Sequence, residues 1–245
     1  MAKGQKSGRC LCHRFVVRVC VCVCVCVGAR ARLFFILVFR LLPIIIYADL
    51  VCFYTLIGIH VTSHSINICI FSEFGLPYTL VGHSERRHSV STEDDKLANA
   101  KVLSALKAGL KVVLCFGEKI ETRKANKTME VVLRSLDVGL NGVDPSQLKN
   151  IVFAYEPVWA IGTSLTASPE QAQEVHAQIR KHFAAKYSAE IAASAIIIYG
   201  GSVKPANCVD LIGQPDIDGF LIGGCSLKPD FMTIINSVCK ATGRL

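Results

Sequence analysis

The sequence predicts an α/β protein in which parallel strands alternate with helices. Short apolar runs, among them Lys111–Phe116, Ile151–Tyr155 and Ile196–Tyr199, are separated by longer amphipathic stretches, and this alternation is typical of βα units. The length of 245 residues agrees with the roughly 250 residues of one (β/α)8 barrel. The expected architecture is therefore barrel-type.

Tyr78–Val81 is the first strand of this pattern. We expect the helix after it to begin at an N-cap on Thr92, with acidic residues in its first turn, and to end at Gly109. The apolar face of this helix is expected to contain Leu97, Ala100, Leu103 and Leu106.

Later elements follow the same rules. Val131, Val132 and Leu136 indicate another helix. Ser168, Pro169 and Gln171 combine a capping box with proline at the first helical position, which predicts a helix that runs to about Tyr187. Its inward residues are expected to be Ala172, Val175, Ile179 and Phe183.

The last expected elements are a strand at residues 219–222 and a helix at residues 231–239. The pattern thus predicts about five βα units. Because a barrel unit takes roughly 31 residues, the 171 residues after Phe74 cannot hold eight of them. We therefore expect residues 74–245 to form an incomplete barrel.

The chain divides into two unlike parts. Residues 1–72 carry eight Lys or Arg and one acid, Asp49, whereas residues 73–245 carry nineteen bases and eighteen acids. Eight of the twelve cysteines also lie in the first 70 residues. The basic balance thus belongs to the N-terminal part, and no nucleic-acid-binding motif accompanies it. Its Cys-x-Cys spacing does not match a zinc site.

Residues 19–27 alternate Val and Cys, as a translated guanine-thymine repeat would. We expect residues 1–73 to be no domain, and translated non-coding sequence is the favoured explanation. The alternative is a targeting segment or membrane anchor, since basic residues precede an apolar region. Charged residues interrupt the apolar runs before they reach the ~20 residues of a membrane span.

Polar groups follow the strands at positions where α/β proteins hold their chemistry. Residues 82–87 read GHSERR after one strand, and residues 154–163 read AYEPVWAIGT at the end of another. Residues 112–118 read VVLCFGE, whereas residues 199–203 and 218–229 contain Gly-Gly pairs. These motifs, in this order, resemble triosephosphate isomerases from about Phe74 onward. The resemblance implies a (β/α)8 TIM barrel.

The resemblance implies catalytic roles for two residues. Glu156 would be the base that moves a proton between adjacent carbons of a small hydroxy-ketone phosphate. His83 would polarise the carbonyl. This family is itself the standard worked case of a neutral histidine electrophile beside a helix N-terminus, so that role comes with the resemblance. Glu85 would be a neighbour in the pocket, and Trp159 would belong to the closing lid.

The resemblance also implies a phosphate site made of backbone N–H groups, where glycine allows close approach. The residues expected there are Gly162, Ser202, Gly223 and Gly224. Arg86 and Arg87 are expected to form ion pairs that fix loops.

The chain departs from the family pattern in several places. Nothing in residues 1–73 reproduces the Asn-x-Lys motif that ends the family's first strand, and the third loop that locks into a partner subunit is missing. Ser164 and Leu165 stand where the lid usually has Gly-Lys. After Arg87, Ser-Val-Ser-Thr replaces the usual Phe-Gly-Glu.

The implied function is a cytoplasmic, homodimeric isomerase of glycolysis and gluconeogenesis. It would interconvert glyceraldehyde 3-phosphate and dihydroxyacetone phosphate through an enediol, with no cofactor and no metal. Two alternatives stay open: a catalytically dead remnant or interaction protein from a mis-spliced transcript, and a membrane-attached protein with a cytosolic isomerase-like domain. The expected partner is the small triose phosphate, with no nucleic acid.

Overall fold

The computed structural model describes residues 77–90, 92–161 and 165–242. Within these ranges, strands β1 to β5 form one parallel sheet in chain order. The strands are β1 (Tyr78–Val81), β2 (Lys111–Phe116), β3 (Ile151–Tyr155), β4 (Ile196–Tyr199) and β5 (Gly219–Phe220). The α/β prediction is confirmed, and the parallel sheet with its alternating helices is consistent with part of a (β/α)8 barrel.

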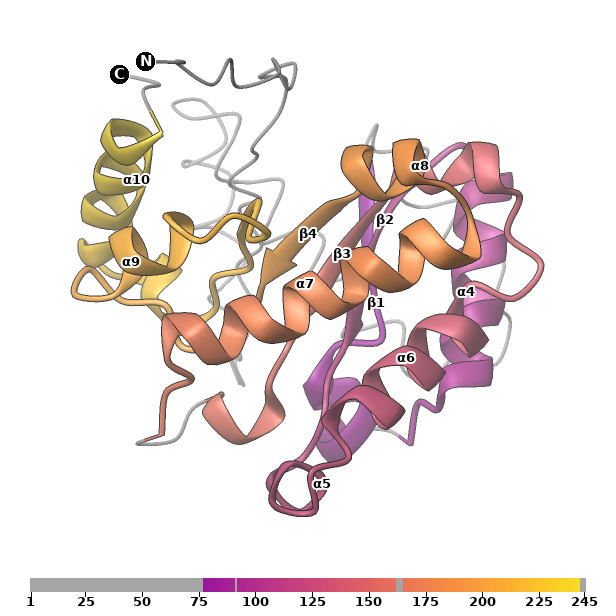
Figure 1. Cartoon of the computed structure of the whole chain (residues 1–245), viewed down its shortest axis with the longest axis horizontal. Helices are drawn as coiled ribbons and strands as arrows, with labels where there is room; N and C mark the ends of the chain where they lie inside the picture. The colour runs from indigo at the N-terminus through magenta and orange to yellow at the C-terminus, as the bar shows by residue number, and fades with distance from the viewer. Residues whose placement is uncertain (1–76, 91, 162–164, 243–245) are drawn as a thin grey trace, which may run out of the picture.

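Helices α4 (Asp95–Lys107), α6 (Thr128–Gly139) and α7 (Pro169–Lys186) lie on the same side of the sheet (Figure 1). They connect successive parallel strands, and each buries an apolar face. The other helices of the described ranges are η2 (Arg86–Val90), α5 (Ile120–Lys124), η3 (Pro145–Asn150), η4 (Val158–Ala160), α8 (Ala189–Ser194), α9 (Cys208–Ile212), η5 (Gly224–Leu227) and α10 (Asp230–Ala241).

Helix α4 corrects the sequence prediction in two respects. Its N-cap is Asp94, which accepts a hydrogen bond from the Leu97 backbone N–H, and not Thr92. Its buried residues are Ala98, Val102 and Ala105, whereas Leu103 of the expected face is 37% exposed. The small side chains on the buried face allow this helix to pack close to the sheet. Close packing therefore decides which face points inward, even though larger apolar residues lie elsewhere on the helix.

Helix α7 confirms the prediction. Ser168 and Gln171 make both hydrogen bonds of the capping box, Pro169 occupies the first turn, and Tyr187 is the C-cap. The four residues expected to point inward are all buried: Ala172, Val175, Ile179 and Phe183. Here local helix signals and the tertiary fold agree.

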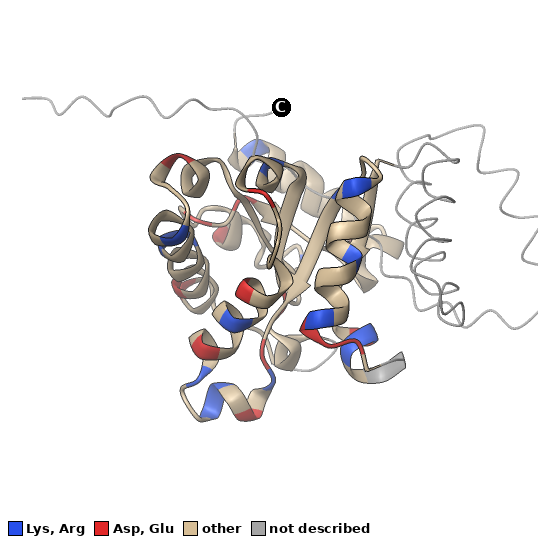
Figure 2. Ribbon diagram, turned by 90° about the vertical axis from the view of Figure 1, so that its right-hand side faces the viewer, with Lys and Arg blue, Asp and Glu red and all other residues tan. Residues whose placement is uncertain are grey.

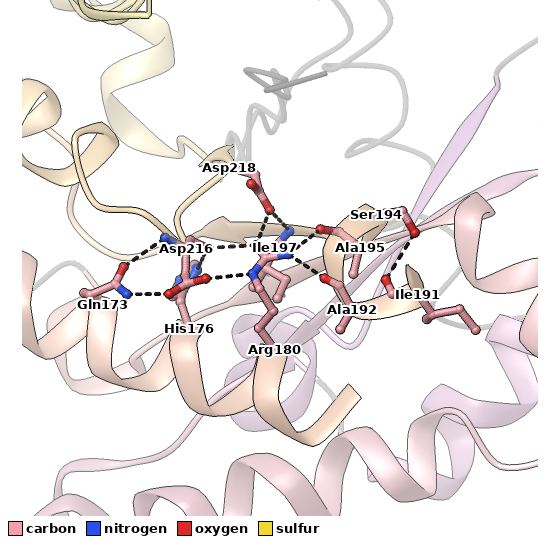
Figure 3. Close-up of polar contacts among 10 residues, drawn as sticks. All are labelled: Gln173, His176, Arg180, Ile191, Ala192, Ser194, Ala195, Ile197, Asp216 and Asp218. Carbon is pink, nitrogen blue, oxygen red and sulfur yellow. Dashed lines mark hydrogen bonds and ion pairs between the residues drawn. The ribbon is translucent and has the colours of Figure 1, made fainter. Parts of the chain in front are cut away.

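A polar cluster around Arg180 joins α7 to the segment that leads into β5 (Figure 3). The Arg180 guanidinium contacts the carboxylates of Asp216 and Asp218 at 2.9 and 2.8 Å. It also donates to the carbonyls of Ala192 and Ala195, near the end of α8. Since the side chain of Asp218 accepts from the Ile197 backbone N–H at the start of β4, this cluster fixes the spacing of the last two strands.

Acidic and basic residues alternate over the helices and loops instead of gathering by sign (Figure 2). None of the helices in the described ranges has the length and apolar character that crossing a membrane requires. The expectations for residues 1–73 concern residues outside the described ranges.

Candidate active site

The candidate residues gather at one edge of the sheet because all five strands are parallel. His83 follows β1, Glu156 follows β3, and Ser202 and Gly223 follow β4 and β5. The carboxyl ends of parallel strands meet at a common edge, which is where barrel proteins carry their reactive groups. The topology therefore places His83 and Gly223, which are 140 positions apart in the sequence, at the same edge of the sheet.

His83 and Glu156 are in direct contact. The imidazole Nε2 lies 3.0 Å from Glu156 Oε1, and the Ser84 backbone N–H donates to Glu156 Oε2 at 3.0 Å. Glu156 is 2% exposed and His83 is 7% exposed. The pair is thus largely shielded from water, which strengthens the electrostatic interaction between its members.

The backbone at the start of a short helical turn orients the His83 ring. The N–H groups of Arg86 and Arg87 donate to the His83 carbonyl, and the Glu85 N–H donates to Nδ1 at 3.4 Å. A ring nitrogen that accepts a hydrogen bond carries no proton, so in the neutral ring the proton sits on Nε2 and points at Glu156.

Two opposing effects act on the pKa of His83. Burial lowers it, because the charged form loses hydration, whereas the Glu156 carboxylate raises it through charge and a hydrogen bond. Glu85 and Glu93 add to the upward shift, and the net pKa lies above the ordinary value of 6.5. The upward shift thus depends on contact with Glu156.

Two glycines make room for Glu156. A Cβ at Gly117 would lie 1.7 Å from the Glu156 carbonyl oxygen, and a Cβ at Gly200 would lie 2.9 Å from Glu156 Cγ. The Glu156 N–H donates to the Phe116 carbonyl at 2.8 Å, continuing the β2–β3 ladder. Burial raises the pKa of the nearby Cys115 thiol well above its ordinary value, and the charge of Glu156 adds to this effect.

Glu118 is a polar residue of this edge that the sequence prediction did not single out. It is 1% exposed and accepts hydrogen bonds from the Tyr155 hydroxyl and from Trp159 Nε1, the latter at 2.9 Å. Arg123 lies 3.6 Å from the same carboxylate and 4.9 Å from the centre of the Trp159 ring. Glu118 lies two residues past β2, as His83 lies two residues past β1. This position could have identified Glu118 from the sequence.

The remaining predicted residues have mixed outcomes. Gly223 precedes η5 and accepts hydrogen bonds from Ser226. A Cβ at Gly223 or Gly224 would have no atom of the described residues within 4 Å. The carbonyl of Ser202 accepts from Asn207 Nδ2. Gly162 lies outside the described ranges. Arg86 and Arg87 form the expected ion pairs, with Glu93 and Asp95 respectively.

The described residues hold no group of three His, Cys, Asp or Glu side chains placed to bind a metal ion. The four cysteines among them, at positions 115, 208, 225 and 239, are free thiols.

The fold and the site define an α/β barrel-type protein with a buried histidine–glutamate pair at the carboxyl edge of its sheet. The sequence model of the triosephosphate isomerase family matches residues 62–238. The chain therefore belongs to the triosephosphate isomerase family. The match begins before Phe74, so it also takes in residues that precede the described part.

Individual relatives agree with this assignment. The chain is 52% identical over 162 residues to triosephosphate isomerase from Paracoccidioides lutzii, covering 66% of this chain and 65% of the relative. It is 51% identical over 172 residues to the enzyme from Pseudomonas putida, covering 70% and 66%. A rice protein named as the cytosolic form is 51% identical over 162 residues, covering 66% and 63%. The chain thus spans just under two thirds of the length of these relatives.

Proposed function

We propose that the chain carries the catalytic pair of a triosephosphate isomerase, which interconverts glyceraldehyde 3-phosphate and dihydroxyacetone phosphate. The observation that supports this most directly is the buried contact between His83 Nε2 and Glu156 Oε1 at 3.0 Å. An aldose–ketose exchange needs one base beside the carbons and one hydrogen-bond donor beside the oxygens. The pair supplies one of each.

In this proposal the Glu156 carboxylate removes a proton from the carbon next to the carbonyl group. His83 donates the Nε2 proton toward the carbonyl oxygen, so that an enediol forms. Glu156 then returns the proton to the neighbouring carbon while His83 exchanges protons with the two oxygens. Substrate entry separates the two side chains and removes the contact that raises the pKa of His83, which favours the neutral ring.

The phosphate would be bound by backbone N–H groups of Gly162, Ser202, Gly223 and Gly224. Among the described residues, none would crowd a Cβ at Gly223 or Gly224, and this supports the role because a phosphate needs room close to the main chain. Trp159 would anchor the start of the lid through Glu118, and Glu85 would support His83 through its backbone N–H. The reaction would need no cofactor and no metal.

The cellular setting belongs to the same proposal: a cytoplasmic homodimer that acts in glycolysis and gluconeogenesis. A second candidate, a catalytically inactive remnant or interaction protein, is favoured by one observation. The chain spans only 65% and 66% of two relatives, and residues 1–73 hold no Asn-x-Lys motif.

A coupled assay of triose phosphate turnover on the 245-residue chain decides between the two candidates, with Glu156→Gln as the matched variant. The isomerase proposal expects turnover that Glu156→Gln lowers by roughly a thousandfold or more, as expected when a general base is lost. Binding of glycerol 3-phosphate, which has the phosphate and no carbonyl, should be spared. Turnover within a few-fold of the parent would reject Glu156 as the base. No turnover in either protein would favour the remnant.

A further inference from the structure

We propose that Arg87 is a positioning residue that holds His83 and Glu156 in register by joining the carboxyl ends of β1 and β2. This inference rests on the proposed function for its catalytic consequence, whereas its structural part concerns the described residues alone. Arg87 belongs to η2, and its side chain folds back toward the end of β1.

The contacts of Arg87 begin where the backbone ladder ends. The last paired residues of β1 and β2 are Val81 and Leu114. Arg87 Nε donates to the carbonyl of Gly82 at 2.6 Å, and Nη2 donates to the carbonyl of Cys115 at 3.2 Å. These carbonyls belong to the next residue of each strand. The guanidinium therefore replaces the missing backbone bonds as the link between the two strand ends.

The guanidinium is held in this orientation from its other side. Nη1 of Arg87 donates to Asp95 Oδ1 at 2.7 Å, and Ser135 donates to the second oxygen of Asp95 at 3.0 Å. Arg87 is only 12% exposed. A planar group with fixed donors can satisfy two carbonyls and a carboxylate together, which a single ammonium group does less well.

The strand ends also require a glycine at position 82. Gly82 has a φ of +75°, and a Cβ there would lie 2.7 Å from Arg87 Nη2 and 2.8 Å from the Cys115 carbonyl oxygen. The close approach of Arg87 is therefore built into the turn. Glu93 holds the same turn from its N–H side, since Gly82 N donates to Glu93 Oε1 at 3.0 Å.

Both members of the candidate pair are attached to these strand ends. His83 directly follows Gly82, and Phe116, which directly follows Cys115, accepts the hydrogen bond of the Glu156 N–H at 2.8 Å. A change in the spacing of Gly82 and Cys115 is therefore passed to the distance between His83 Nε2 and Glu156 Oε1. A shift of this kind is enough to slow a reaction that depends on alignment.

The test compares Arg87→Lys with Arg180→Lys in the full chain. Lysine keeps the positive charge, so the direct electrostatic effect on the site changes little. Arg180 is the matched control, because it is also partly buried and also bridges carboxylates and backbone carbonyls, but between α7 and the segment that leads into β5. The readout is the imidazole titration of His83 by NMR, with the signal identified by its absence in His83→Gln.

We expect Arg87→Lys to lower the pKa of His83, because burial remains while the contact with Glu156 weakens. Arg180→Lys should leave the titration unchanged although it also destabilises the fold. Where turnover is measurable, Arg87→Lys should lower kcat by roughly tenfold to a hundredfold with little change in KM.

The proposal is overturned if neither variant moves the His83 titration, or if both move it equally. Should Arg87→Lys not fold, Asp95→Asn carries the decision, since it keeps the arginine and weakens only its orienting partner. An unchanged His83 titration in that variant would also refute the role. A parent chain without turnover would reject the proposed function and still leave the titration to judge the positioning role.

Discussion

Two buried histidines show how position, at the scale of single residues, sets the protonation state. His83 touches Glu156, and its pKa lies above the ordinary value. His176 in α7 is fully buried between the rings of Tyr155 and Tyr199, and burial lowers its pKa to about 4. Its Nδ1 lies 3.2 Å from the Asp216 carbonyl, so the neutral ring donates there. The two residues therefore affect stability with opposite signs.

His176 should make the fold sensitive to acid. The unfolded chain binds a proton here below pH 6.5, whereas the folded chain does so only below about 4. The stabilising contribution is thus complete above pH 6.5 and is lost as the pH falls to 4, by about 3 kcal/mol in total. In His176→Asn this part of the pH dependence should disappear.

Urea unfolding at a series of pH values measures this effect. The comparison variant is His182→Asn, which removes a half-buried histidine that pairs with Asp137. His83 acts in the other direction, because a raised pKa adds stability below pH 6.5 that is lost as the pH rises through the folded value. Parallel stability curves for the parent and His176→Asn between pH 6.5 and 4 would contradict the prediction.

Gly117→Ala should be strongly destabilising. The new Cβ would lie 1.7 Å from the backbone oxygen of Glu156, and backbone cannot turn aside as a flexible side chain can. We expect a loss of about 3 kcal/mol or more in the free energy of unfolding. The control is Gly139→Ala in α6, where the nearest atom outside the helix is 3.4 Å away. Similar stabilities for the two variants, measured by denaturant unfolding, would refute the clash.

At the scale of elements, the helices differ in how they begin. Helix α7 has a complete capping box, whereas α5 and α6 begin at Lys119 and Lys127 without a side-chain cap. A capping box satisfies two N–H groups at the helix start that would otherwise lack a partner within the helix. This matters for the site because α7 follows the segment that contains Glu156 and carries Arg180, which fixes the approach to β5.

Ser168→Ala should therefore cost about 1 kcal/mol, the usual loss for an N-cap serine. The hydroxyl accepts from the Gln171 N–H at 3.2 Å, and Gln171 in return accepts from the Ser168 N–H at 3.1 Å. Ser194→Ala, at the exposed end of α8, should change stability by less than about 0.5 kcal/mol. Thermal unfolding compares the stabilities of the two variants. Equal losses of stability would show that the capping box does not stabilise the fold.

At the scale of the whole molecule, the described strands form an open sheet. The order runs from β1 to β5, so the outer edges of these two strands pair with no other described strand. In a barrel, the backbone groups of the edge strands are paired only when the sheet closes on itself. In the proposed mechanism, His83 and Glu156 need only β1, β2 and β3 to be aligned, whereas a lid over the substrate would need an opposite wall to close against.

A polypeptide of these 245 residues should accordingly be a poor isomerase. No residue in positions 1–73 matches the family's Asn-x-Lys motif, whose lysine the resemblance assigns to the substrate phosphate. The loss of one charged contact to the substrate costs roughly a hundredfold in rate. Purified chain compared with a full-length relative in the coupled assay measures kcat/KM. Comparable values of kcat/KM would contradict this prediction.

The sequence alone determined the elements whose signals are local. The capping box at Ser168 and the strand bounds of β2, β3 and β4 needed only apolar period and cap chemistry, which depend on neighbours in the chain. The motifs at residues 82–87 and 154–163 likewise identified His83 and Glu156, which the parallel topology then brought into contact.

Only the tertiary structure decided which face of α4 is buried, because Ala98 and Ala105 point inward where Leu97 and Leu103 were expected. It also decided the long-range partners of Arg87 and Glu118: Arg87 donates to the Cys115 carbonyl 28 positions away, and Glu118 accepts from Trp159 41 positions away. Such contacts depend on how strands and helices pack in space, and no periodicity in the sequence predicts which distant residues will meet. The raised pKa of His83 was also beyond the reach of the sequence, because it depends on the carboxylate of Glu156, 73 positions away.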